Sequence, residues 1–116
     1  MIRAVLSLFG AIALTACQHH QAPQPAVLID ADAATLAALR AELAPAMNRA
    51  NIEFGAGDPT VSPSIAVLPP KPSALETQSV AMPTLFNLYM KGATCIAIRE
   101  GSEEEIILQN VACRPL

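Results

Sequence analysis

The sequence predicts an α+β domain in which one N-terminal helix, kinked at Pro45, packs on a small antiparallel β-meander after a proline-rich connector. Apolar side chains recur at helical spacing between about residues 32 and 51. Residues 58–83 are rich in proline, and three short strand-like segments separated by glycines follow within residues 84–113. A helix and a small sheet each present one apolar face, so we expect the two to bury these faces against each other.

The first sixteen residues have the pattern of an export signal. Arg3 is followed by thirteen uncharged residues, Ala4–Ala16. This run is shorter than the about 20 apolar residues that a membrane-spanning helix needs. A basic start, an apolar centre and small residues at the end are typical of a secretory signal peptide. Residues 1–16 are therefore predicted to be removed from the mature protein.

Leu14-Thr15-Ala16-Cys17 resembles the lipobox of bacterial lipoprotein precursors. In that family the cysteine thiol receives a diacylglyceryl group as a thioether, the chain is cut just before the cysteine, and the new amine is acylated. The resemblance implies that Cys17 carries acyl chains such as palmitate and anchors the protein in an envelope membrane. The alternative is ordinary cleavage after Ala11-Ile12-Ala13, which leaves Cys17 as an exported thiol open to oxidation.

The residues after Cys17 indicate the compartment. In Gram-negative lipoproteins an aspartate at this position usually specifies retention in the inner membrane, so Gln18 favours the outer membrane and its periplasmic face. Residues 17–26 are then a lipidated cysteine and a flexible tether. Cys17-Gln18-His19 with a free amine could form an amino-terminal copper or nickel site, but lipidation and acylation remove the thiolate and the amine of Cys17. We expect two solvated histidines and no metal or other cofactor.

Composition limits the partners of the mature chain of 100 residues. It keeps six basic and ten acidic residues, a net charge of −4, and has no basic run and no tryptophan. These features argue against nucleic acid, and no small-molecule substrate is evident. With Cys17 lipidated, Cys95 and Cys113 remain as an even pair in an oxidising compartment, which predicts a disulfide. Closing a loop of this length stabilises a domain by about 3 kcal/mol.

Residues 27–116 are predicted to fold, beginning with Val27–Ile29 as a short strand or as the lead into the helix. Asp30 or Asp32 can cap the helix, because a carboxylate accepts hydrogen bonds from the free N–H groups of the first turn. Pro45 should kink or split the helix, which we expect to end before Gly55. Its apolar stripe consists of Leu36, Leu39, Leu43, Met47 and Ala50, with small alanines (Ala37, Ala38, Ala41) on the other side.

A proline-rich connector follows the helix. Ser64–Leu68 is predicted to be a strand at the edge of the sheet, because prolines bound it. Pro69-Pro70-Lys71-Pro72 should be extended in the polyproline II conformation. Such a segment is either a stiff spacer or a ligand for an aromatic groove in a partner protein. We favour the spacer and retain Pro69, Pro70, Lys71 and Pro72 as candidate partner-binding residues.

The meander is predicted from strands at Leu85–Met90, Thr94–Arg99 and Glu105–Gln109, with Phe86, Leu88 and Met90 on one face. A second turn centred near Ser102 and Glu103 places Asn110, not Cys113, opposite Cys95. The disulfide therefore requires a bulge or loop around Asn110.

The sequence contains no recognisable catalytic arrangement. A nucleophile needs a base beside it, and both histidines lie in the tether. Glu100, Glu103, Glu104 and Glu105 are the densest acidic cluster, but alternate strand residues point to opposite sides, so a solvated hairpin tip is expected. We therefore expect a non-catalytic structural or interaction lipoprotein that docks on another envelope protein. The alternative is a lipid-anchored periplasmic inhibitor of a lysozyme or protease.

Overall fold

The structure is a computed structural model, which describes Gly10 and residues 22–71 and 81–116. The predicted signal peptide, apart from Gly10, and the predicted lipidation site Cys17 lie outside these residues. The described residues form one α-helix and six strands, so the predicted α+β fold is confirmed. The elements are β1 (Gln24–Leu28), α1 (Ala33–Leu43), the 3₁₀ turn η1 (Pro45–Met47), β2 (Ser64–Val67), β3 (Thr84–Lys91), β4 (Thr94–Arg99), β5 (Glu105–Ile107) and β6 (Cys113–Pro115).

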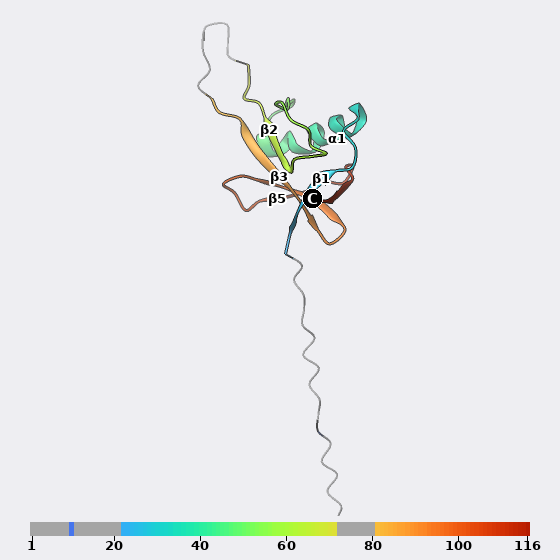
Figure 1. Cartoon of the computed structure of the whole chain (residues 1–116). Helices are drawn as coiled ribbons and strands as arrows, with labels where there is room; N and C mark the ends of the chain where they lie inside the picture. Colours follow the sequence, from blue (N-terminus) through green and yellow to red (C-terminus); the bar gives the residue numbers. More distant parts are fainter. Residues whose placement is uncertain (1–9, 11–21, 72–80) are drawn as a thin grey trace, which may run out of the picture.

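All strand pairs of the sheet are antiparallel, in the order β5-β4-β3-β1-β6 (Figure 1). The second edge of β3 is shared, because β2 pairs with its first half and β1 pairs with its end. The predicted meander is therefore confirmed as β3, β4 and β5. The short strand β1 pairs with both β3 and β6, and so joins this meander to β6. In sequence order β1 is the first and β6 the last of the described strands.

Two glycines form the turns of the meander. Lys91 is paired with Thr94, so Gly92 and Ala93 are the two turn residues between β3 and β4. Gly92 has a φ of 63° and Gly101, in the second turn, has a φ of 82°. This left-handed region is open to glycine at little steric cost. The positive φ angles thus explain why glycine occurs at both turns, where the sequence predicts them.

Helix α1 begins and ends at residues with recognisable capping roles. The Asp32 side chain accepts a hydrogen bond from Thr35 N at 2.7 Å, and hydrogen bonds from the side chain and backbone of Thr35 hold the pKa of Asp32 below its usual range. The α-helix ends at Leu43, and Pro45 starts the 3₁₀ turn η1. The expected helix to about residue 51 is therefore too long, because Asn48 adopts a left-handed φ of 52°.

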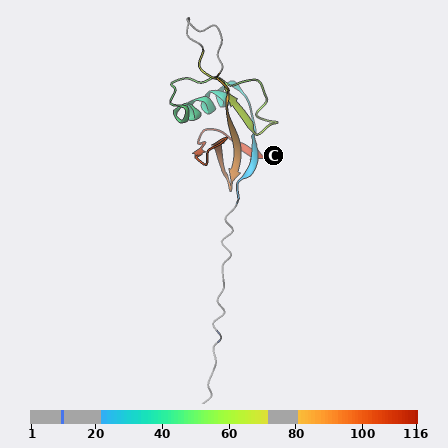
Figure 2. The same ribbon diagram turned by 90° about the vertical axis from the view of Figure 1, so that its left-hand side faces the viewer.

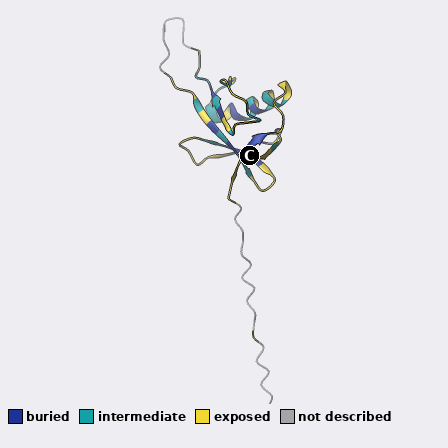
Figure 3. Ribbon diagram, viewed as in Figure 1, coloured by how far each residue is buried: buried dark blue, intermediate teal, exposed yellow. Residues whose placement is uncertain are grey.

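The core lies between α1 and one face of the sheet (Figures 2 and 3). Leu39 and Leu43 of α1 are fully buried in one cluster with Phe86 and Leu88 of β3. The predicted helix stripe therefore packs on the predicted strand face, except that Ala50 is exposed. Fully burying each such side chain contributes about 1.5–3 kcal/mol. The remaining core members are mainly Ala26, Leu28, Ala44, Ile52, Ile65, Val67, Ala97, Leu108 and Val111.

Cys95 and Cys113 form the predicted disulfide, which joins β4 to β6 with a Cα–Cα distance of 5.7 Å. Two strands, β3 and β1, lie between β4 and β6 in the sheet order. In a flat sheet three strand spacings would separate them by about 14 Å. The sheet must therefore curl toward its buried face, and the disulfide fixes this curl.

The register of the last hairpin differs from the prediction by two residues. Leu108 N donates to Cys95 O at 2.9 Å, so Leu108 rather than Asn110 lies opposite Cys95. The reason is that Ile98 pairs with Glu105, which places the centre of the turn nearer to Gly101 than we expected. The predicted loop is present, since residues 109–112 leave the sheet edge and lead to β6.

Candidate functional site

One concavity of the described residues is a groove of about 190 Å³ between α1 and the segment that leads to β2. Leu39 and Ile65, both buried, belong to its apolar lining. Phe54 and Arg40 lie at its sides. We call this feature the α1–β2 groove; its full lining is Leu36, Leu39, Arg40, Phe54, Gly55, Ala56, Gly57, Pro59, Ser64, Ile65 and Ala66.

A short antiparallel bridge between Phe54 and Val67 of β2 positions the aromatic residue of the groove. Gly55 N donates to Ala66 O at 2.8 Å, and Leu68 N donates to Glu53 O at 2.8 Å. A Cβ atom on Gly55 would lie 3.3 Å from the Cβ of Ala66, tighter than an ordinary contact. Glycine at position 55 therefore permits the close approach of this segment to β2.

A turn around Pro59 contributes to the lining of the groove. The Asp58 carboxylate accepts hydrogen bonds from the hydroxyl and backbone N–H of Thr60 at 2.6 and 2.9 Å. These bonds hold the pKa of Asp58 below its usual range, with the side-chain hydrogen bond as the larger cause. Pro59 O accepts from Leu28 N of β1 at 2.8 Å, which ties the turn to the sheet.

Arg40 is the charged residue of the groove. Its guanidinium carbon lies 5.3 Å from the centroid of the Phe54 ring, within the range of a cation–π interaction. Within residues 22–71 and 81–116 no acidic side chain forms an ion pair with Arg40, since the one salt bridge there joins Lys91 to Glu105. The groove thus has one cationic side chain among lining residues that are mostly apolar or small.

The size of the groove suits one side chain of a partner. An apolar cavity of about 150 Å³ holds a benzene molecule, whereas drug-sized ligands occupy about 300–1,000 Å³. The α1–β2 groove therefore fits one large aliphatic or aromatic side chain. A carboxylate next to that side chain could pair with Arg40.

Ser64 carries the one hydroxyl group of the groove lining. Its Oγ donates to Asn87 Oδ1 at 2.7 Å. An amide oxygen does not remove a proton as a general base does, so this contact orients Ser64 without activating it as a nucleophile. The lining contains no histidine, aspartate, glutamate or cysteine. The lining therefore holds no nucleophile with a general base beside it.

The proline-rich candidate residues lie beyond the end of β2, outside the groove lining. Pro69 is half-buried, whereas Pro70 and Lys71 are exposed. Arg49 Nη1 donates to Leu68 O at 2.8 Å and so fixes the start of this segment to the residues after η1. Pro72 lies outside the described residues. The partner-binding role of these four residues stays a prediction.

The acidic residues of the second turn are exposed and spread out. Glu103 and Glu104 lie in the turn, while Glu105 begins β5 and pairs with Lys91 Nζ at 3.3 Å. Across the part of the chain that the structure describes, no group of three or more histidine, cysteine, aspartate or glutamate side chains could hold a metal ion. His19 and His20 lie outside this part.

Glu42 has a structural role that the sequence did not indicate. Its Oε1 accepts hydrogen bonds from the backbone N–H groups of Gln109 and Asn110 at 2.5 and 3.2 Å. The carboxylate on α1 therefore holds the loop that leads to β6. This contact brings together residues that are 67 and 68 positions apart.

The α1–β2 groove was not foreseen from the sequence. Phe54 is one of four aromatic residues, and Gly55 and Gly57 follow it closely, but this pattern predicts only the end of a helix. In the described segments no helix is long and apolar enough to cross a membrane. No protein-family model matches the sequence, and comparisons with curated proteins and with solved structures find no similar chain.

Proposed function

We propose that the chain is a lipid-anchored envelope protein whose mature domain binds another envelope protein and catalyses no reaction. The anchor is Cys17, on the strength of the Leu14-Thr15-Ala16-Cys17 motif. Two or three acyl chains on one cysteine hold a protein to a membrane effectively permanently, since each buried CH₂ contributes about 0.8 kcal/mol. The Gln18 that follows favours the outer membrane of a Gram-negative host.

The α1–β2 groove is the single observation that carries the binding function. Its apolar lining residues would contact one large side chain of the partner, which removes apolar surface from water on both sides. Arg40 would select a partner with a carboxylate beside that side chain, because charge-assisted hydrogen bonds to arginine are directional. A single buried anchor of this kind often dominates the energy of a protein interface.

Charge reversal at two positions distinguishes this groove from the proline-rich segment. Lipidated protein carrying Arg40→Glu or Lys71→Glu is crosslinked in intact envelopes and the captured proteins are compared with those of the wild type. We expect Arg40→Glu to lose the specific partner, because a carboxylate at the groove repels the acidic group of that partner. Lys71→Glu, with equal thermal stability, should keep it.

The reverse result, with capture lost in Lys71→Glu and kept in Arg40→Glu, would place the partner site in Pro69–Pro72. Stoichiometric inhibition of lysozyme or of a general protease by the purified domain would replace the interaction role by that of an inhibitor. The anchor is tested separately by palmitate labelling, which Cys17→Ser should abolish together with signal cleavage. An unlabelled but cleaved wild type would refute the anchor.

A further inference from the structure

Three segments meet at the end of the sheet where residue 22 leads into β1. Gln24 is paired with Met90 of β3, and Ala26 is paired with Pro115 of β6. The β3–β4 turn lies at the same end of the domain, as both Figure 1 and Figure 2 show. We call residues 22–26, 90–94 and 114–115 the tether end.

The tether end has a charge opposite to that of the whole mature chain. It contains Lys91 and Arg114 and no acidic side chain, although the chain has ten acidic residues. Arg114 is exposed and forms no ion pair with a described residue. Lys91 pairs with Glu105 at 3.3 Å, but the two side chains are 50% and 38% exposed. A surface pair of this kind contributes little, so the ammonium group remains available to another anion.

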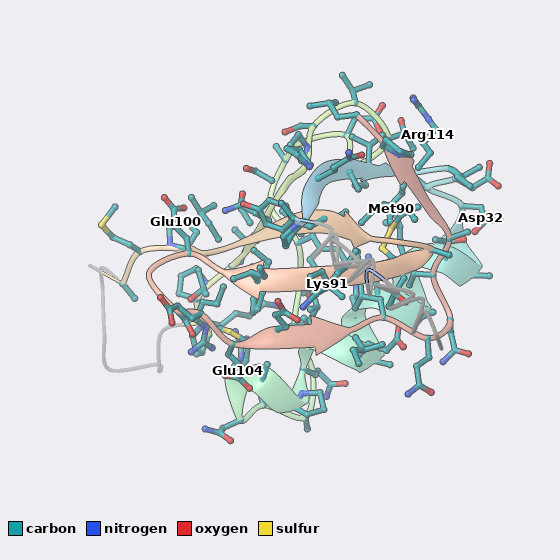
Figure 4. All side chains as sticks on the ribbon, turned by 90° about the horizontal axis from the view of Figure 1, so that it is seen from below. Asp32, Met90, Lys91, Glu100, Glu104 and Arg114 are labelled. Carbon is teal, nitrogen blue, oxygen red and sulfur yellow. A yellow bond between two sulfur atoms is a disulfide. The ribbon has the colours of Figure 1, made fainter. Side chains whose placement is uncertain are left out.

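The other exposed residues of the tether end are mostly apolar or small. Pro23, Pro25, Ala93 and Pro115 are exposed, and Met90 is half-buried among them. Figure 4 looks at the molecule from this side and labels Met90, Lys91 and Arg114. The acidic residue Asp32 is labelled beside Met90 in this view, and Glu100 and Glu104 are labelled farther away. An apolar surface with two cations at its rim suits the boundary between phosphate headgroups and acyl chains.

The length of the chain before residue 22 restricts which face can reach the membrane. Five residue steps separate Cys17 from Ala22, and an extended chain covers about 3.5 Å per residue, so this link reaches at most about 18 Å. A lipid on Cys17 therefore keeps the tether end close to the headgroups. Helix α1 and strand β2, which both contribute residues to the groove, lie toward the other side of the domain (Figure 1).

We propose that the tether end docks on the anionic phospholipid surface that holds the Cys17 anchor, with Lys91 and Arg114 contacting lipid phosphates. This inference rests on the lipid anchor proposed above. Each basic side chain close to an anionic leaflet contributes about 1 kcal/mol, or about a five-fold change in the ratio of docked to undocked protein. Removing both should lower that ratio about 30-fold.

The absence of tryptophan from the chain gives a direct measurement. Ala93→Trp places a reporter in the tether end, and Ala37→Trp places a matched reporter on the exposed side of α1. Each full-length lipidated variant is reconstituted in phosphatidylcholine–phosphatidylglycerol vesicles that contain headgroup-labelled quencher lipid. We expect strong quenching of Ala93→Trp and little quenching of Ala37→Trp. Adding Lys91→Gln and Arg114→Gln should reduce the quenching, whereas the control Lys71→Gln should not.

Flotation of the same samples with the vesicles separates the two proposals. Equal quenching of the two tryptophans in protein that floats would refute docking and leave the anchor intact. Strong quenching at Ala93→Trp that is unchanged by Lys91→Gln and Arg114→Gln would refute the phosphate contacts. Wild-type protein that does not float would refute the anchor, and docking with it.

Discussion

The disulfide between Cys95 and Cys113 should be the largest single covalent contribution to the stability of the domain. The perturbation is the double variant Cys95→Ala and Cys113→Ala, which opens a loop of 18 residues. In the chain-entropy model a loop of this length constrains the unfolded chain by about 3 kcal/mol. Cys95 is 6% exposed, so the variant also loses some core packing.

The loss of stability should be greatest around β6. β6 is held to the sheet by three paired positions with β1, and the loop before it is held by Glu42. Without the disulfide, the curl that brings β4 to within 5.7 Å of β6 depends on these contacts alone. We therefore expect β6 to exchange its amide protons faster than β3, which is paired along both edges.

Thermal unfolding followed by circular dichroism provides the assay. For a domain of this size a loss of about 3 kcal/mol lowers the Tm by roughly 12–24 °C. The wild type in excess reductant should give the same shift as the double variant, whereas reductant should leave the variant unchanged. A Tm within a few degrees of the wild type would show that the disulfide does not fix the curl of the sheet.

Three further perturbations test single elements of the fold. Below pH 4, the stability of the domain should fall as Asp32 and Asp58 become protonated. A carboxyl group whose pKa is lowered in the folded state contributes stability that is lost as the pH falls through that pKa. Asp32→Asn keeps a capping oxygen and should reduce this pH dependence, as measured by melting curves at several pH values. Leu43→Ala should cost about 2–5 kcal/mol in urea unfolding, since Leu43 is fully buried; a cost below 1 kcal/mol would contradict its place in the core. Gly55→Ala should cost about 1–3 kcal/mol, because its Cβ would press on Ala66, and an unchanged Tm would show that β2 yields easily.

The elements that the sequence predicts well are those with local signals. The spacing of Leu36, Leu39 and Leu43 is helical, and Asp32 offers a cap at the start of that pattern. In the same way, the alternation of apolar and polar side chains in β3 and the glycines at the turns predicted the meander. The disulfide was predicted because the expected lipidation of Cys17 leaves Cys95 and Cys113 as the two remaining cysteines.

The features that the sequence did not predict depend on distant contacts. β6 is three residues long and carries no alternating pattern, so its pairing with β1 cannot be inferred from local propensity. The α1–β2 groove depends on the bridge between Phe54 and Val67, which places a loop residue beside a strand. Glu42 holds residues 67 and 68 positions away. In each case tertiary packing decides the structure.

The α1–β2 groove and the tether end share no residue. Helix α1 and strand β2, which contribute residues to the groove, lie toward the side of the domain opposite the tether end (Figure 1). An anchored protein whose tether end rests on lipid would therefore turn the groove away from the membrane, toward a partner in the periplasm. If both proposals hold, the two functions should separate by substitution. Lys91→Gln with Arg114→Gln should lose docking and keep partner capture, while Arg40→Glu should do the opposite. Loss of both functions in either variant, at unchanged Tm, would mean that one surface serves both.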